Sequence, residues 1–313
     1  MTTEKLDIVT IGESLIEFSS SESLTFAQSL QKYYGGDSLC TAIAALRLGA
    51  KVGFISKVGI DPFKDYLLDA WQNEGLDISQ VKLQNGYNGI YFIALPIDSE
   101  KEFSHYRKRS AATYIDVDDI NEDYIKSSKI FYATGLTQSL SLNTKEAVFK
   151  AFKIAKDNKL ITAYDLNYSP SVWSMVEAKA AFDEISDYID ILFLNQVRDG
   201  EKVFEIDSVE KLIKYFWDKG IKTIVVRSVK DNGCYVGTEG NISFYEYKNE
   251  RIVDATSSGD AFNGAFLYAI SQGMSNIEAA KIAIITGSLQ AQNVGAIKSI
   301  PYHNEVFECL KGE

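Results

Sequence analysis

The chain has 313 residues, of which 46% are hydrophobic and 24% are charged, and it contains 21 glycines but only 4 prolines. This composition excludes a disordered or collagen-like protein and provides ample material for a buried core. Acidic residues outnumber basic ones by 43 to 32, and the resulting net charge of −11 repels nucleic-acid phosphates and anionic lipid surfaces. We therefore expect neither a nucleic acid nor a membrane as a partner.

Hydropathy and cysteine usage indicate a compartment. No apolar stretch approaches the roughly 20 residues that a membrane-spanning helix needs, and the first residues are not typical of a targeting segment. Cys40, Cys234 and Cys309 are widely spaced and form neither a CxxC pair nor a zinc-binding pattern. We expect a protein of the reducing cytoplasm, without structural disulfides.

Short apolar runs rich in β-branched residues alternate along the chain with segments of helical spacing. Because strands that alternate with helices form parallel sheets, we expect an α/β fold: a doubly wound, mostly parallel sheet with helices on both faces. No linker divides the chain, so we expect one domain over residues 1–313. The predicted strands are 8–11, 52–58, 130–133, 160–164, 189–194 and 223–226, and the predicted helices are 38–48, 61–73, 145–157, 174–185, 208–219, 260–272 and 276–291.

Two segments, residues 13–34 and 82–113, break this rhythm. They contain short strand-like runs in which aromatic residues alternate with polar ones, with turn candidates at Gly86, Asn88, Gly89 and residues 97–99. We expect them to form a small β-sheet that projects beyond the main body as a lid over a cleft.

The run Tyr33-Tyr34-Gly35-Gly36-Asp37 leads into the predicted helix at 38–48. Paired glycines before a helix allow backbone amides to approach a ligand, and the helix N-terminus favours an anionic or polar group. A tight turn before a helix capped by Asp37 or Ser38 explains the same residues without a ligand. From the spacing alone, the capped helix is the stronger interpretation.

A second polar turn, Asp254-Ala255-Thr256-Ser257-Ser258-Gly259-Asp260, leads into the helix at 260–272. Small residues at this position expose the first amides of the helix as an anion site, and Asp260 is placed to act as a base on a hydroxyl aimed at that anion. An ordinary N-cap formed by Ser or Asp is the simpler alternative.

In their order and spacing these motifs make the chain similar to the ribokinase family of carbohydrate kinases, and within it the chain most resembles 2-keto-3-deoxygluconate kinases. The resemblance covers nearly the whole length. It rests on Ile11-Gly12-Glu13, Gly35-Gly36-Asp37-Ser38-Leu39, residues 44–49 (AALRLG), 58–63 (VGIDPF), 103–112 (FSHYRKRSAA), 165–170 (DLNYSP) with Trp173, and Gly259-Asp260-Ala261-Phe262.

The resemblance implies an ATP-dependent phosphotransferase with Mg²⁺ that acts on a sugar or sugar acid, 2-keto-3-deoxygluconate or a related ketoaldonate. Asp260 would be the general base, and the amides of Ser257, Ser258 and Gly259 would stabilise the transferring phosphoryl group. A homodimer formed through the lid is a further family-level expectation. The implied substrate-binding residues are Gly35, Gly36, Tyr91, His105, Arg107 and Asn167, the nucleotide-binding residues are Asn195, Arg227, Val229 and Gly233, and Asp254 is the candidate ligand of a monovalent cation.

The chain departs from the family pattern near the expected sugar. The phosphate turn, usually Gly-Ala-Gly-Asp, reads Ser257-Ser258-Gly259-Asp260, so Ser257 is strained if the turn requires a positive φ. Cys40 stands where the sugar-acid kinases carry asparagine, and a lid tyrosine is replaced by His105. The arginine expected before Pro170 is Ser169, which removes a partner for a carboxylate.

The nucleotide side departs as well. The family's Asn-x-x-Glu, whose acid orders Mg²⁺ through water, reads Asn195-Gln196-Val197-Arg198, and Asp199 or Glu201 could replace that acid only with a shifted backbone. Val229 stands where a glycine usually lies against the nucleotide, and a branched side chain there would crowd it. The sequence therefore leaves open a working kinase, for a ketoaldonate or for another sugar such as fructose, and an impaired relative that binds sugar without phosphorylating it. The retained Asp260 and Gly259 favour the kinase.

Overall fold

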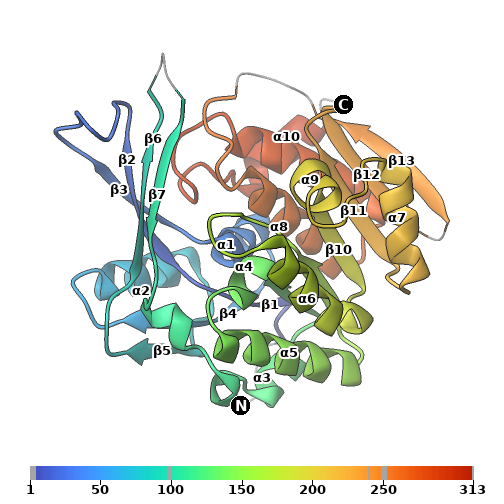
Figure 1. The fold of residues 1–313 in the computed structure, drawn as a ribbon, viewed down its shortest axis with the longest axis horizontal. Coiled ribbons are helices and arrows are strands. Elements are labelled where there is room, and N and C mark those ends of the chain that lie inside the picture. Colours follow the sequence, from blue (N-terminus) through green and yellow to red (C-terminus); the bar gives the residue numbers. More distant parts are fainter. Residues whose placement is uncertain (1–4, 97–99, 239, 248–251, 312–313) are drawn as a thin grey trace.

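A nine-stranded sheet forms the centre of the molecule, with the strand order β13-β12-β11-β10-β9-β8-β1-β4-β5 (Figure 1). The structure is a computed structural model that describes residues 5–96, 100–238, 240–247 and 252–311. From β5 to β11 neighbouring strands are parallel, and β12 and β13 add an antiparallel hairpin at one edge. The strands are β1 (Ile8–Ile11), β4 (Val52–Gly59), β5 (Val81–Gln84), β8 (Ile130–Thr134), β9 (Ile161–Asp165), β10 (Ile191–Asn195), β11 (Thr223–Ser228), β12 (Gly233–Thr238) and β13 (Asn241–Glu246).

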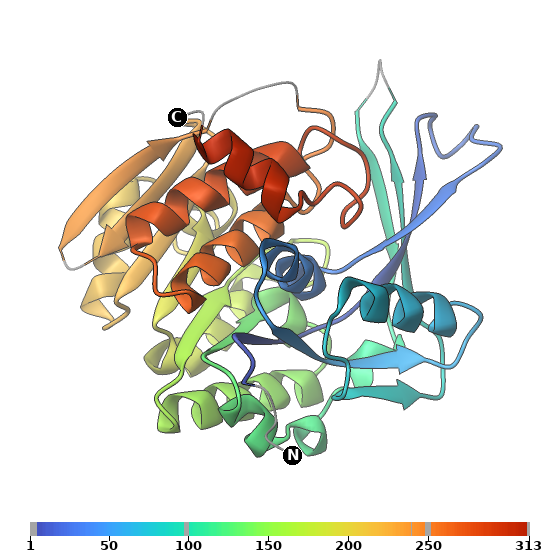
Figure 2. The same ribbon diagram turned by 180° about the vertical axis from the view of Figure 1, so that it is seen from behind.

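Helices cover both faces of this sheet, because alternate residues of each strand point to opposite faces. In β1, Ile8 contributes to the core on one face, whereas Val9 and Ile11 contribute to the core on the other. The face turned to the viewer in Figure 2 carries α1 (Asp37–Leu48), α2 (Lys64–Glu74), α8 (Ser258–Ser271), α9 (Asn276–Gln290) and α10 (His303–Lys311). The opposite face carries α3 (Glu122–Lys126), α5 (Leu142–Asp157), α6 (Met175–Ile185) and α7 (Val209–Asp218).

Short helical segments occur between the main elements. They are α4 (Gly135–Gln138), the 3₁₀ turns η1 (Ala111–Tyr114), η2 (Val117–Asp119) and η3 (Ser186–Tyr188), and one turn of π-helix, η4 (Gln196–Glu201). The predicted α/β fold is thus confirmed. The β12–β13 hairpin was not expected from the apolar runs. Within the described residues, no helix has both the length and the apolar character needed to cross a membrane.

A separate four-stranded sheet, the lid, stands beside the main sheet (Figure 1). Its strands, in spatial order, are β3 (Gln31–Gly35), β2 (Leu15–Ser20), β6 (Gly89–Ala94) and β7 (Glu102–Tyr106). The parallel pairing of β2 with β6 joins the two segments that break the rhythm of the sequence. One boundary needs correction: residues 82–84 pair with β4 in the main sheet, because a parallel crossover through α2 returns the chain there first. The expected turn at 97–99 falls outside the described residues.

The two helices that begin at the candidate motifs, α1 and α8, pack closely against each other. A Cβ atom at Gly264 in α8 would lie 2.3 Å from the Thr41 carbonyl oxygen and 2.7 Å from the Ala44 Cβ of α1. Only glycine fits this crossing, so the backbones of the two helices approach at a fixed distance. The crossing sets where both N-termini lie relative to each other.

We expect Gly264→Ala to destabilise the fold by about 1–3 kcal/mol, because the added methyl group overpacks this crossing. Helix propensity alone predicts the opposite sign, since alanine stabilises a helix by roughly 0.5–1 kcal/mol relative to glycine. Denaturant unfolding of the variant and the parent chain distinguishes the two. An increase in the free energy of unfolding would show that the helices tolerate a wider separation.

Candidate active site

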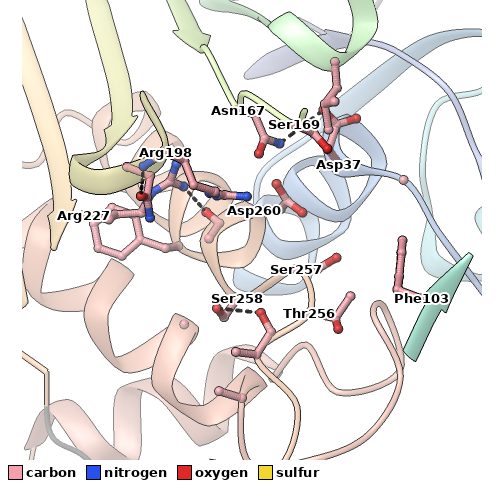
Figure 3. Close-up of a pocket in the computed structure, with 18 of the residues that line it drawn as sticks. Asp37, Phe103, Asn167, Ser169, Arg198, Arg227, Thr256, Ser257, Ser258 and Asp260 are labelled. Atoms are coloured by element: carbon pink, nitrogen blue, oxygen red, sulfur yellow. Dashed lines mark hydrogen bonds between the residues drawn. The ribbon is translucent and has the colours of Figure 1, made fainter. Parts of the chain in front are cut away.

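A cavity of about 790 Å³ opens between the lid and the carboxyl ends of the parallel strands (Figure 3). In open α/β sheets this edge is where ligands bind, because the loops after successive strands meet there. Glu13 follows β1, Asn167 follows β9, Asn195 ends β10 and Arg227 lies near the end of β11, and all four line the cavity. From the other sides the lid contributes Tyr91, Lys101, Phe103, His105 and Arg107, and the α8 turn contributes residues 255–260.

The two glycines before α1 are required mainly by the packing of the backbone around them. Gly36 is the N-cap of α1, with φ 138° and no side-chain capping hydrogen bond, so the expectation of a cap by Asp37 or Ser38 is wrong. A Cβ at Gly36 would lie 2.3 Å from the Glu13 carbonyl oxygen, and one at Gly35 would lie 2.9 Å from the Tyr91 hydroxyl. Gly36 lines the cavity, whereas Gly35 packs behind it.

Because Asp37 does not cap α1, its side chain is free to point into the cavity. Its Oδ2 atom accepts a hydrogen bond from Thr134 Oγ1 at 2.5 Å and lies 3.5 Å from Asn167 Nδ2. Burial raises the pKa of Asp37, and the hydrogen bond from Thr134 partly offsets this. Asn167 itself has φ 43°, a left-handed conformation that asparagine tolerates better than most residues. The two side chains lie near each other in Figure 3.

The turn before α8 is also uncapped. Ser257 occupies the N-cap position with φ 63° and makes no side-chain capping hydrogen bond, so the ordinary N-cap interpretation is wrong and the expected strain is confirmed. The first amides of an uncapped helix lack side-chain acceptors and carry the positive end of the helix dipole. Ser257, Ser258 and Gly259 line the cavity with Asp260. The uncapped start of α8 is therefore suited to bind an anion.

A buried network beneath the turn fixes its position. Arg227 Nη2 pairs with Asp165 Oδ2 at 2.7 Å, and Arg227 Nη1 donates to the Gly259 carbonyl oxygen and to Asn263 Oδ1, each at 2.8 Å. Asn263 Nδ2 in turn donates to the same Asp165 oxygen at 2.7 Å. Arg227 therefore holds the first turn of α8 against the sheet. The sequence, which predicted Arg227 as a nucleotide contact, did not reveal this structural role.

Three carboxylates converge at this point: Asp37, Asp165 and Asp260. Burial raises the pKa of Asp260 well above its usual value, and the negative charges of Asp37 and Asp165 raise it further, while Arg227 and a hydrogen bond from Ser257 lower it. A carboxyl group with a raised pKa holds a proton more readily near neutral pH, as a general base does. Figure 3 draws Asp37 and Asp260 facing the same space.

Arg107 under the lid is neither solvated nor alone. Its Nη2 lies 2.9 Å from Glu13 Oε1, and the two side chains are only 11% and 4% exposed, so the solvated-turn interpretation of Arg107 is wrong. Burial raises the pKa of Glu13 to about 7, with Arg107 lowering it and Asp37 raising it. Glu13 Oε2 has no hydrogen-bond partner in the described part of the chain. The pair therefore offers an unused acceptor to a polar ligand.

Tyr91 and His105 complete the lid side of the cavity. Tyr91 is buried and donates a short hydrogen bond to the Glu17 carboxylate. It is therefore not an ordinary half-buried strand residue. Burial, and to a smaller extent the charge of Arg107, lowers the pKa of His105 to about 4. His105 is therefore neutral at physiological pH and can both donate and accept hydrogen bonds.

Asp254 lies at the foot of the α8 turn, behind the cavity wall. It is 2% exposed, and its Oδ1 atom lies 3.3 Å from Lys101 Nζ and accepts a hydrogen bond from the Thr256 amide at 3.0 Å. Its Oδ2 atom has no hydrogen-bond partner among the described residues. The lid lysine thus compensates the negative charge of Asp254 within the chain itself.

Among the residues predicted to bind the nucleotide, Asn195 ends β10 and caps η4. Its Oδ1 atom accepts from the Val197 amide at 3.1 Å and from the Arg198 amide at 2.8 Å. Asp199 is fully buried and accepts from the Asn195 and Tyr168 amides at 2.6 and 3.0 Å, so it does not replace the acid that the family carries at Arg198. Glu201 pairs with Lys230 at 2.5 Å instead of facing the cavity.

Of the two other residues predicted to bind the nucleotide, Val229 lines the cavity and Gly233 does not. The Val229 side chain is 80% exposed at the cavity rim, so it offers an apolar surface without filling the cavity. Gly233 begins β12 and does not line the cavity, and a Cβ there would lie 2.4 Å from the Tyr245 carbonyl oxygen. We conclude that Gly233 is required by strand packing.

Several cavity residues were not predicted. Glu13 could have been found, because it lies two residues beyond β1 at the carboxyl edge where ligands bind. Lys101 and Phe103 of the lid and Tyr247 beyond β13 reach the cavity only through tertiary folding. No local signal marks them.

The family model for pfkB family carbohydrate kinases matches residues 5–302. The chain belongs to this family. Similar curated proteins include 5-dehydro-2-deoxygluconokinase of Clostridium perfringens, which is 28% identical over 99% of this chain and 94% of its own length. Fructokinase-1 of Oryza sativa subsp. japonica is 32% identical over 97% of each chain, and 2-dehydro-3-deoxygluconokinase of Thermoproteus tenax is 28% identical over 98% of this chain and 94% of its own.

Solved structures show the same fold. A putative ribokinase II of E. coli in complex with ATP and Mg²⁺ has a TM-score of 0.88 at 23% identity, over 98% of this chain and 100% of that one. 2-Dehydro-3-deoxygluconokinase of Thermotoga maritima has a TM-score of 0.88 at 22% identity, over 98% and 99% of the two chains. The ribokinase-like architecture with its lid is therefore established, as the sequence predicted.

The left-handed turn residue gives a stability test. Because a non-glycine residue at positive φ costs about 1–2 kcal/mol, we expect Ser257→Gly to raise the free energy of unfolding by up to about 1 kcal/mol. The neighbouring Ser258 is the first residue of α8, so Ser258→Gly is a matched control that should lower it by about 0.5–1 kcal/mol. Urea unfolding of both variants provides the measurement, and the reverse order of stabilities would contradict a strained Ser257.

Proposed function

We propose that the protein is an ATP-dependent kinase that phosphorylates a hydroxyl group of a ketoaldonate, such as 2-keto-3-deoxygluconate, with Asp260 as general base. The observation that carries this proposal is the position of Asp260, in the first turn of an uncapped helix that faces the cavity. A phosphoryl group bound at the amides of Ser257, Ser258 and Gly259 lies beside the carboxylate. Asp260 takes the proton from the sugar hydroxyl as the hydroxyl oxygen attacks the γ-phosphorus. The bond between the γ-phosphorus and the bridging oxygen of the β-phosphate breaks, and ADP leaves.

The cofactors of this proposal are ATP and Mg²⁺. No group of three His, Cys, Asp or Glu side chains within the described residues could hold a metal ion by itself. The carboxylates of Glu13, Asp37 and Asp260 on the cavity wall fit an Mg²⁺ ion that arrives on the nucleotide, since this ion prefers oxygen ligands and keeps several waters. When bound, it would offset phosphate charge. A monovalent cation at Asp254 fits only if it shares that carboxylate with Lys101.

For the substrate, the lid and the α1 turn offer polar groups suited to a sugar. Gly36, Asp37, Tyr91, His105, Arg107 and Asn167 surround one end of the cavity. Arginine is an apt partner for the carboxylate of a sugar acid, because its forked donors match two carboxylate oxygens. Relatives named for 5-dehydro-2-deoxygluconate and 2-dehydro-3-deoxygluconate support a substrate of this class.

A neutral ketose such as fructose is the second candidate, and one contact favours it. Glu13 already neutralises Arg107 at 2.9 Å, and Ser169 supplies no cation to the cavity. A substrate carboxylate would have to compete with Glu13 for the guanidinium. A relative named fructokinase-1 is consistent with this alternative. Cytoplasmic location and a dimer through the lid stay predictions.

The proposal predicts sugar-dependent ADP release that falls by about 10²- to 10⁴-fold in Asp260→Asn, because this change removes the general base. The panel comprises 2-keto-3-deoxygluconate, 5-keto-2-deoxygluconate, other ketoaldonates, fructose, ribose and nucleosides. Sugar binding, followed by thermal shift, should persist in the variant. Asp65→Asn, at an exposed position on α2, is the matched control and should keep full activity. Thermal shifts without turnover on any substrate would support a binding protein instead.

The raised pKa of Asp260 predicts an unusual acidic limb. A base must be deprotonated to act, so kcat/KM should fall as the pH drops through the pKa of Asp260, which lies well above the ordinary value of about 4. Asp37→Asn removes a negative charge and should shift the limb to lower pH. Glu13 also has a raised pKa, so Glu13→Gln is the control: a limb that disappears in this variant would assign the titration to Glu13.

A further inference from the structure

Arg198 differs from the other cations of the cavity. Four basic side chains line this space, and three of them are neutralised by nearby carboxylates, whereas in the described ranges no carboxylate oxygen lies within 4.0 Å of the Arg198 guanidinium. Arg198 is also exposed. The three neutralised pairs are Lys101 with Asp254 at 3.3 Å, Arg107 with Glu13 at 2.9 Å, and Arg227 with Asp165 at 2.7 Å.

The backbone of Arg198 is held while its side chain stays available. Asn195 Oδ1 accepts the Arg198 amide at 2.8 Å, and the Asn195 amide donates to the buried Asp199 at 2.6 Å. The residue lies in the π-helical turn η4, and such turns occur frequently at functional sites. A fixed Cα, with a guanidinium that has no carboxylate partner among the described residues, is an arrangement that a ligand can complete.

The location of Arg198 selects the chemistry of that ligand. It lies on the β10 and β11 side of the cavity, and Figure 3 draws it beside Arg227 and on the same side of Asp260. The sugar-facing groups, such as Arg107, come from the lid across the cavity. An anion that extends from the α8 turn toward the rim at Val229 would pass Arg198.

Electrostatics points to phosphate. Three carboxylates, those of Glu13, Asp37 and Asp260, line the cavity in a chain of net charge −11, so a polyphosphate needs fixed positive charge to enter. The amides of the α8 turn serve one phosphoryl group. An arginine fork, permanently charged and weakly hydrated, matches the oxygens of the phosphate groups behind it.

We propose that Arg198 binds phosphate oxygens of the nucleotide and compensates their charge from the protein side. The inference rests on the proposed function, because its ligand is the ATP of that reaction. Arg198 then contributes to the affinity for nucleotides with phosphates beyond the first, and it contributes little to the binding of a nucleoside monophosphate.

Calorimetric binding of ATP, ADP and AMP, each with Mg²⁺, to Arg198→Gln tests this directly. A charged hydrogen bond contributes about 1.5–3 kcal/mol, so the affinity for ATP should fall on the order of 10- to 100-fold, while that for AMP should stay within about twofold. Arg198→Lys should lie between the two. Lys202→Gln removes the same charge from an exposed residue that does not line the cavity, and it should bind ATP as the parent does.

The outcomes separate the two proposals. Equal affinity of Arg198→Gln and the parent for ATP, or an equal loss for ATP and AMP, would overturn the phosphate contact while the kinase proposal stands. A parent chain that binds no nucleotide would overturn both. Because Arg198 is exposed, the variant should melt at the temperature of the parent, and this measurement shows that a loss of binding is local.

Discussion

The active-site end of the molecule depends on one buried ion pair, between Arg227 in β11 and Asp165 at the end of β9. Their atoms lie 2.7 Å apart in a region where the two side chains are 8% and 0% exposed. Buried charges persist only with good partners, and here the same guanidinium also holds the Gly259 carbonyl and Asn263. The pair thus couples two strands to the first turn of α8. Thr41 Oγ1 in α1 donates to the Asp260 carbonyl oxygen as well, but Arg227 is the side chain that ties the turn to the sheet.

The position of this turn explains two features that are unfavourable by themselves. Ser257 adopts a left-handed conformation and leaves the amides of α8 uncapped, a strain that survives only where the surrounding structure determines it. Burial raises the pKa of Asp260, and the charges of Asp37 and Asp165 raise it further, although Arg227 limits the effect. Stability and strain are therefore linked: the network that tethers the turn also brings the acids together. A site for phosphoryl transfer needs both the exposed amides and the neighbouring base.

The sequence predicted what depends on local pattern. Apolar runs located all the parallel strands except β5, and the change of rhythm located the lid, because strand and helix periodicities differ and leave a clear signature. It failed where tertiary packing overrides preference. Serine and aspartate are favoured caps, yet no side-chain capping hydrogen bond forms at the start of α1 or α8. The resemblance implied a nucleotide contact for Arg227, but its buried ion pair was missed, because its partner, Asp165, lies 62 residues earlier in the chain. No periodicity reports a pair at that separation.

The departures from the family pattern follow one physical rule. Functions supplied by the backbone tolerate substitution: Ser257 and Ser258 replace small residues, and both still line the cavity. Side-chain charges do not transfer in this way. Ser169 removes a cation near the expected sugar, whereas Arg198 adds one on the nucleotide side in place of an acid. Compared with the family pattern, a positive charge is lost at residue 169 and gained at residue 198. Under the proposed function, such a chain would rely less on charge at the sugar, where Glu13 already balances Arg107, and more on its own arginine at the phosphates.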